Sequence, residues 1–128
     1  MDFSKEFKAS FGLDSVVIRK YINGIQGGRT LDLTGYSADE KILKAGHVVI
    51  YDPTSKRYKP MPISGNSYSS LPDSHVYVGV IARSVSVEDP TVSIMNIGAV
   101  NSLAVPFDMT SILSAFKSDV PTIVWEND

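Results

Sequence analysis

The two histidines, His47 and His75, are the residues of this chain best suited to metal binding or acid–base chemistry at neutral pH. Each lies at a run of apolar residues typical of a β-strand, and neither has a His, Asp or Glu two residues further along that strand. A metal site needs several such ligands together, so we expect no metal, and isolated strand histidines favour a packing role. The chain has no cysteine, which excludes disulfides, thiolate metal sites and a cysteine nucleophile.

The other catalytic motifs are incomplete. Residues 65–69 (GNSYS) lack the second glycine of a G-x-S-x-G nucleophile elbow. Residues 24–29 (GIQGGR) look like a phosphate loop, but they lack the Lys-Ser or Lys-Thr pair and precede a strand pattern. The acidic clusters lie at expected turns or at the end of the chain, where solvation explains them. We therefore expect no enzyme and no cofactor, although a Ser-His-Asp triad drawn from distant segments stays open.

The aromatic residues raise a different alternative, a monomeric carbohydrate- or peptide-binding β module. The chain has six tyrosines and one tryptophan, and exposed aromatic rings stack on sugars. Tyr51, Tyr77 and Trp125, however, stand among β-branched residues, a context typical of packed strands. Packing is the interpretation that we favour for these three rings.

Length and charge exclude further classes of protein. The 128 residues suffice for one domain, and 43% apolar with 20% charged residues is typical of a folded globular chain. The net charge of -2 shows no excess of Lys and Arg of the kind that binds the phosphates of nucleic acid. No apolar run approaches the roughly 20 residues of a membrane span, and the first residues lack a signal-peptide pattern. We expect a protein that binds neither nucleic acid nor membrane.

The elements that would position these residues are mostly short strands. β-Branched or alternating runs predict strands over residues 15–22, 29–33, 47–51, 75–82, 91–97 and 122–125. In the strand predicted over residues 75–82, alternation places Val76, Val78 and Val80 on one face of the sheet. It places His75, Tyr77 and Ile81 on the other face.

Turns and helices separate the strands. Residues 37–40 (SADE) match a capping box and predict a helix of one or two turns over residues 41–45, while residues 64–74 predict a surface loop. Pro60 and Pro62 predict that Met61 lies on a sheet edge or in an extended connection. The most convincing helix follows Asp108, a candidate N-cap, with apolar side chains at helical spacing: Met109, Ile112, Leu113 and Phe116. The whole pattern predicts a mainly-β fold, a small barrel or sandwich with one C-terminal helix and short turns.

The chain is expected to divide into an N-terminal arm, residues 1–14, and a single β-rich domain, residues 15–128. Phe3, Phe7 and Phe11 are four residues apart and would form one stripe on a helix. Two interpretations stay open. The stripe packs against its own domain, or it becomes ordered only against a partner.

Several motifs, taken in order, resemble one family. Residues 45–52 (AGHVVIYD) and 58–61 (YKPM) resemble the opening of phage head decoration proteins of the lambda type. Residues 78–81 (VGVI) and 94–101 (IMNIGAVN) are similar to the strands that follow in that family, and the late helix, proline and apolar strand match its ending. The resemblance covers about two-thirds of the chain and omits the Phe-bearing segment and the loop 64–74.

The resemblance implies a structural virion protein, made in the bacterial host cytoplasm and located on the capsid surface. It implies a homotrimer that binds the major capsid protein and stabilises the head. Because the N-terminal segment of this family becomes ordered on the capsid, Phe3, Phe7 and Phe11 are the expected capsid contacts, and Trp125 is an expected trimer contact. A phage head fibre base is a related alternative, since parts of the chain lie outside the family pattern.

Three glycines interrupt strand-like runs, where glycine costs stability unless the geometry requires it. We expect Gly46 and Gly98 at turns or bulges with positive φ, and Gly79 at a close approach of two backbones.

Overall fold

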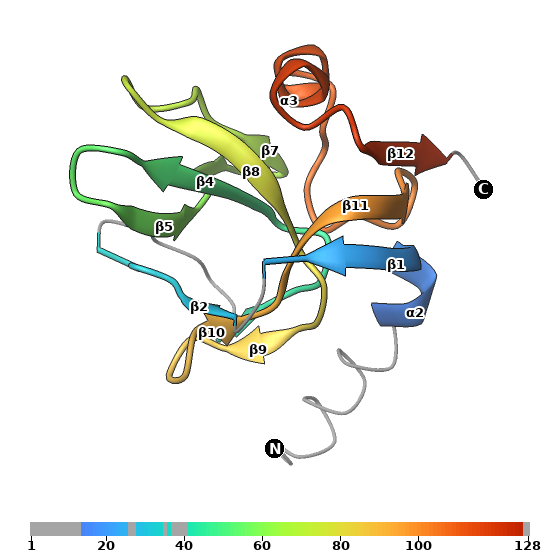
Figure 1. Ribbon diagram of the computed structural model, residues 1–128, viewed down its shortest axis with the longest axis horizontal. Coiled ribbons are helices and arrows are strands. Elements are labelled where there is room, and N and C mark those ends of the chain that lie inside the picture. Colours follow the sequence, from blue (N-terminus) through green and yellow to red (C-terminus); the bar gives the residue numbers. More distant parts are fainter. Residues whose placement is uncertain (1–13, 26–27, 35, 37–40, 127–128) are drawn as a thin grey trace.

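The computed structural model describes residues 14–25, 28–34, 36 and 41–126 (Figure 1). The elements in chain order are α2 (Asp14–Val17), β1 (Ile18–Gly24), β2 (Arg29–Thr30), β3 (Ile42–Leu43), β4 (Val48–Asp52), β5 (Arg57–Pro60), β6 (Ile63–Ser64), β7 (Ser67–Tyr68), β8 (Val76–Ile81), β9 (Val85–Ser86), β10 (Thr91–Val92), β11 (Ile94–Asn101), α3 (Leu113–Asp119) and β12 (Ile123–Glu126). The fold is mainly β with one helix near the C-terminal end, which confirms the predicted class.

One six-stranded sheet organises the molecule, with the order β1-β11-β8-β4-β5 and with β12 paired to β11. Only the β11–β12 pair is parallel among these ladders. Three two-stranded pairs, β2–β10, β3–β9 and β6–β7, lie outside this sheet. The sheet is open, because none of the described ladders joins β5 back to β1.

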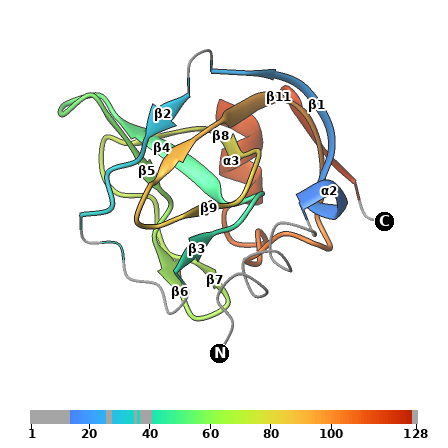
Figure 2. The ribbon, with the colours of Figure 1, turned by 90° about the horizontal axis from the view of Figure 1, so that it is seen from below.

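The central strands of this sheet are buried on both faces. Val48 and Ile50 of β4 belong to one apolar cluster, while Val49 between them belongs to a second. Helix α3 covers the first face through Phe116. Leu43 of β3, Val92 of β10 and Leu31, directly after β2, pack against the second. Figure 2, seen from below, places β3 and β9 in front of the sheet and α3 behind it. Because each side of a central strand is covered, its sequence is a continuous apolar run.

The β4–β5 hairpin shows how the sequence encodes a turn and an edge. Asp52 ends β4, and its carboxylate accepts hydrogen bonds from the Thr54 backbone N–H at 3.0 Å and from the Ser55 hydroxyl at 2.9 Å. Pro60 closes β5 at the edge of the sheet, opposite Val49, as the proline rule predicts. Strand and turn were both predictable here from local residues.

Strand β8 departs from the predicted alternation. Tyr77 and Val80 pack in the first cluster, whereas Val78 and Ile81 pack in the second, so the three valines do not share one face. The pairing with β4 explains this result: Val49 faces Gly79 and Ile50 faces Tyr77, which leaves Val78 as an extra residue. Such a bulge shifts the alternation by one residue.

The C-terminal helix begins later than predicted. Asp108 does not cap it, because its carboxylate accepts from the backbone N–H and hydroxyl of Thr110, and its own N–H donates to Asn66. These contacts tie the segment to the β6–β7 hairpin and delay the helix until Leu113. The apolar stripe is nevertheless inward, with the predicted residues buried or half-buried: Met109, Ile112, Leu113 and Phe116.

Two further predictions near the N-terminal half are wrong in part. The strand predicted over residues 15–22 starts at Ile18, because β11 ends at Asn101, just beyond the pair of Ile18 with Val100, and gives no ladder before it. Residues 41–45 contain β3 rather than a helix, since Ile42 pairs with Ser86 of β9. The proposed capping box, residues 37–40, lies outside the described residues.

The loop predicted over residues 64–74 is not wholly a surface excursion. Tyr68 of β7 is buried, and its hydroxyl accepts a hydrogen bond from the Val48 backbone N–H at 3.0 Å. A mainly polar segment therefore contains one buried side chain, Tyr68, which packs into the core. Strand β11 also extends past Gly98, where the sequence predicted an end, and continues to Asn101.

Candidate interaction surface

His47 is a packing residue in this fold. Its ring is buried, and three aromatic rings surround it edge-on with centroids 5.4–5.7 Å away: Tyr36, Tyr68 and Phe107. The Nε2 atom lies 3.0 Å from the Met61 carbonyl oxygen, which can only accept, so Nε2–H donates. Burial disfavours the charged imidazole and lowers the pKa of His47 to about 4. A neutral ring in this position joins β4 to the segment after β5.

His75 lies directly before β8 and has a different setting. Its Nδ1–H donates to the Asp73 carbonyl oxygen at 2.8 Å, and its Nε2 lies 3.8 Å from Asp52 Oδ2, too far for a hydrogen bond. Within the described ranges, no three His, Asp or Glu side chains come together in a way that suits a metal ion. Neither histidine therefore forms a recognisable metal centre with its described neighbours.

Most of the exposed apolar side chains lie on elements next to strand β11. Six large apolar residues of the described chain are exposed, and five of them lie on α2, β1, β12 or the turn after β11: Val16, Tyr21, Ile22, Leu103 and Val124. We call these five residues the β1/β12 surface. The elements that carry them are neighbours, because β1 and β12 pair with the two edges of β11 (Figure 1). The Ser102 N–H, next to Leu103, donates to Glu126 O of β12. Exposed apolar residues on neighbouring elements are typical of a contact surface.

Strand β12 presents two neighbouring residues in opposite ways. Trp125 is half-buried, and its ring packs edge-on against Phe116 of α3 with centroids 5.4 Å apart. Val124 points away from the core and is 58% exposed. The indole Nε1 of Trp125 is buried with no hydrogen-bond partner among the described residues. The sequence predicts Trp125 as the trimer contact, but the outward residue of this strand is Val124.

Strand β1 is irregular and exposed along most of its length. Its pairing with β11 slips at three places, between Ile18 and Lys20, between Tyr21 and Asn23, and between Asn23 and Gly24. Five of its seven residues are exposed. Among the described strands, only β11 pairs with β1, so its outer edge is open to a further strand. An open edge beside apolar side chains suits association by strand addition.

The three singled-out glycines occupy crowded positions. Gly46 has φ 90°, and a Cβ there would lie 2.5 Å from Val17 Cγ1. Gly79 sits in the β8 bulge, where a Cβ would overlap the Met95 carbonyl oxygen of the adjacent strand. Gly98 lies inside β11 rather than at a turn, but its φ of 159° is positive and it lies opposite a register slip of β1, as a bulge position would. A Cβ there would overlap the Lys20 carbonyl oxygen of β1. All three glycines allow close packing of backbone or core.

The predicted capsid contacts, Phe3, Phe7 and Phe11, lie outside the described residues, as does most of the predicted arm. Sequence reasoning singled out none of the five residues of the β1/β12 surface. Local sequence gives them no distinguishing signal, because apolar residues in strands are normally taken as core. Their exposure depends on which elements cover each strand in three dimensions.

Comparison with family models, with curated proteins and with solved structures finds no match to this chain. No helix in the described part of the chain has the length and apolar character needed to cross a membrane.

Proposed function

We propose that this chain is a structural virion protein of the head-decoration type. It binds the outer capsid surface as a homotrimer, contacts the major capsid protein and stabilises the head. It acts by binding rather than by catalysis and needs no cofactor. The order of motifs that resembles lambda-type decoration proteins suggests this role, and the β1/β12 surface supports it.

The single observation that carries the proposal is the position of the exposed apolar residues. Of the six exposed large apolar residues in the described chain, five lie on α2, β1, β12 or the turn after β11, and β1 has an open edge among the described strands. Apolar area removed from water contributes about 25 cal/mol per Å². A contact that covers these side chains therefore favours association, and repetition of one such contact around an axis gives a closed ring.

Capsid attachment requires a second contact, which we assign to the Phe-bearing segment. Each copy in a trimer would present one segment with Phe3, Phe7 and Phe11. Three weak contacts on one rigid body act together through effective concentration, so a modest single contact becomes firm attachment. In this proposal the β1/β12 surface mediates self-association, and the N-terminal Phe-bearing segment contacts the capsid.

Two alternatives differ in what they expect from the β1/β12 surface. A head fibre base also assembles on the virion, and it would bind a fibre as well as the capsid. A monomeric carbohydrate- or peptide-binding module would leave the surface uncovered in solution. The oligomeric state separates the module from the first two proposals, and a capsid-binding assay separates capsid attachment from fibre binding.

A co-sedimentation assay with expanded, undecorated phage heads tests the proposal. The wild-type chain is expected to pellet with the heads and to raise their resistance to heat or chelator. The variant Val124→Asp, which places a charge on the β1/β12 surface, is expected to lose trimer formation and most of the binding. If the wild-type trimer never pellets with the heads of the phage or prophage that encodes it, the decoration role is wrong.

A further inference from the structure

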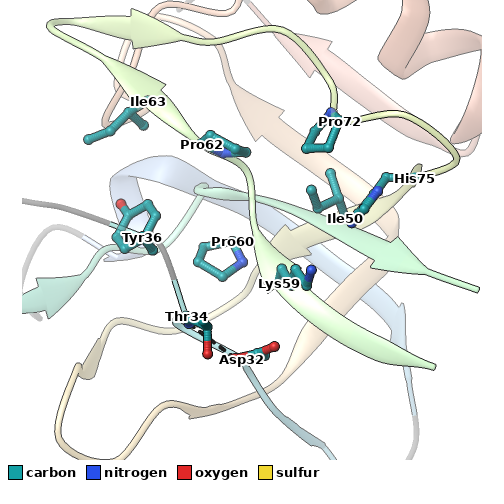
Figure 3. Close-up of a pocket in the computed structure, with 10 residues that line it drawn as sticks. All are labelled: Asp32, Thr34, Tyr36, Ile50, Lys59, Pro60, Pro62, Ile63, Pro72 and His75. Carbon is teal, nitrogen blue, oxygen red and sulfur yellow. Dashed lines mark hydrogen bonds between the residues drawn. The ribbon is translucent and has the colours of Figure 1, made fainter. Parts of the chain in front are cut away.

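A pocket lies at the β5 end of the main sheet, away from the β1/β12 surface. Its volume is about 240 Å³, enough for a single ring-sized group. Figure 3 shows Tyr36 on one side, His75 on the other, proline rings above and between them, and Asp32 with Thr34 below. The remaining wall is mostly apolar and consists of Ile50, Lys59, Pro60, Pro62, Ile63 and Pro72.

Asp32 gives this pocket a fixed hydrogen-bond acceptor. Its Oδ1 accepts from the Thr34 backbone N–H at 3.0 Å, which orients the carboxylate, and its Oδ2 lies 3.6 Å from Arg57. The hydrogen bonds from Thr34, with smaller contributions from Arg57 and Lys59, hold the pKa of Asp32 below its usual value. The group is therefore an ionised carboxylate at neutral pH, and ionised oxygens accept strong hydrogen bonds from hydroxyl groups.

The charges around the pocket are balanced, which disfavours a charged ligand. Arg57 faces Asp32, and the Lys59 ammonium lies 3.8 Å from Asp52 Oδ2. Each cation thus has an acidic partner, so neither an anion nor a cation finds a net opposite charge. Lys59 keeps further N–H groups for donation, since an ammonium carries three. The pocket therefore offers acceptor and donor groups to a neutral ligand.

A purely apolar group fits this pocket less well than a hydroxylated ring. A proline or aliphatic side chain would displace water from the remaining hydrogen-bonding positions of Asp32 and Lys59 without replacing it, which is unfavourable. A sugar ring instead has hydroxyl groups at its rim and C–H groups on its faces. The rim suits Asp32 and Lys59, and the C–H faces suit the Tyr36 and proline rings.

A second hollow, of about 570 Å³, shares Asp32 with the pocket. Besides Leu33 and Tyr58, it is bordered by three basic residues, Arg29, Lys56 and Arg57, whose N–H groups can donate hydrogen bonds to sugar oxygens. Asp32 thus stands between two depressions and is placed to contact two adjoining groups of one ligand. We propose that this part of the molecule binds a neutral oligosaccharide, with one ring in the pocket and Asp32 as the central acceptor.

The site is independent of the proposed function. Strand β5 carries Lys59 and Pro60, whereas the β1/β12 surface belongs to strands at the far end of the sheet order. A trimer that uses the β1/β12 surface leaves the pocket accessible. Sugar binding and capsid decoration can therefore be tested, and can fail, separately.

The experiment is a titration of the full-length ¹⁵N-labelled protein with four neutral disaccharides: maltose, cellobiose, lactose and di-N-acetylchitobiose. We expect at least one of them to shift the backbone amide resonances of Asp32, Thr34, Lys59, Met61 and His75 with millimolar affinity. Asp32→Asn keeps the size of the side chain but removes its charge, and it should weaken binding about tenfold. Thr34→Trp changes an exposed residue of the pocket wall and should abolish binding by occupying the pocket.

Asp108→Asn is the matched control, because Asp108 accepts from Thr110 in the same two-residue turn geometry as Asp32 with Thr34. It should leave sugar binding unchanged, and so should Val124→Asp. Three results would overturn the proposal: no disaccharide shifts these resonances, Asp32→Asn and Asp108→Asn weaken binding equally, or a proline-rich peptide shifts them where no sugar does. None of these results would bear on the trimer or on capsid binding.

Discussion

The rings of Trp125 and Phe116 pack edge to face, with centroids 5.4 Å apart and planes at 78°. This contact joins the last described strand to α3, and it places Val124, the residue before Trp125, on the outside of the molecule. Strand β12 therefore stabilises its own chain with one side and presents an apolar residue on the other.

This relationship predicts opposite effects for substitutions at two adjacent positions. Trp125→Ala should lower the free energy of unfolding by about 2 kcal/mol, since it removes a half-buried ring from the core. Val124→Asp should change the stability of the isolated chain by less than about 0.5 kcal/mol, because the side chain is exposed, and should instead prevent self-association. Urea denaturation and sedimentation velocity of both variants measure the two effects. An equal loss of stability in the two variants would contradict the assignment of Trp125 to the core and of Val124 to the surface.

Gly98 should tolerate no side chain. A Cβ would overlap the Lys20 carbonyl oxygen and lie 2.6 Å from Met95 Sδ, so Gly98→Val should destabilise the fold by more than about 2 kcal/mol. Gly46→Val, at φ 90° and against Val17, should cost more than about 1 kcal/mol. Gly65 is the control, because its φ of 64° is also positive but no atom beyond its chain neighbours lies within 4 Å of the position that a Cβ would take, so Gly65→Ala isolates the backbone effect. Thermal melting that is unchanged in both valine variants would show that this account of the glycines is wrong.

His47 should make the fold sensitive to mild acid. Its pKa falls from 6.5 to about 4 on burial, so the unfolded chain binds the proton more readily than the folded one. The stabilisation is complete above pH 6.5 and is lost as the pH falls towards 4, by about 2–3 kcal/mol at about pH 4.5. Hydrogen bonds hold the pKa values of Asp32, Asp52 and Asp108 below 3.8, so their contributions are lost only at still lower pH.

Urea midpoints measured from about pH 7 to about pH 4.5 test this prediction. The variant His75→Asn should retain the loss of stability, because His75 lies outside the aromatic cluster around His47. His47→Asn should start less stable and should show a flatter pH profile. A wild-type midpoint that does not change over this range would refute the role of His47.

Deletion of residues 1–13 should separate self-association from capsid attachment. If the Phe-bearing segment is an arm, the shortened chain keeps its trimer and its melting temperature but no longer co-sediments with phage heads. The physical reason is that ordering a segment costs about 1–2 kcal/mol per residue, which the phenylalanines offset only against a partner. Triple substitution of Phe3, Phe7 and Phe11 by serine should give the same result. Unfolding of the shortened chain would instead place the three rings in the core.

The parts of the fold that could be predicted from sequence are those decided by local residues. The β-branched runs gave β4 and β8 their strand character, Asp52 specified the hairpin turn, and the inward stripe around Phe116 followed from helical spacing. In each case the relevant contacts lie within a few residues. Propensity and periodicity then agree with the final structure.

The parts that could not be predicted depend on distant partners. Asp108 fails to cap the helix because Asn66 and Thr110 engage its segment, and Val78 changes face because of a bulge opposite β4. The exposure of Ile22 and Val124 follows from which strands flank β11. The pocket around Asp32 likewise combines segments up to about 40 residues apart. None of these contacts leaves a periodic signal in the sequence.

The mass of the full-length chain in solution is the most direct test of the central claim. Sedimentation equilibrium over a wide concentration range should give a species of three times the 13.9 kDa chain mass. The same measurement on Val124→Asp should give the single-chain mass with an unchanged circular dichroism spectrum. A wild-type chain that stays at 13.9 kDa at every concentration would contradict the trimer and, with it, the proposed mode of capsid decoration.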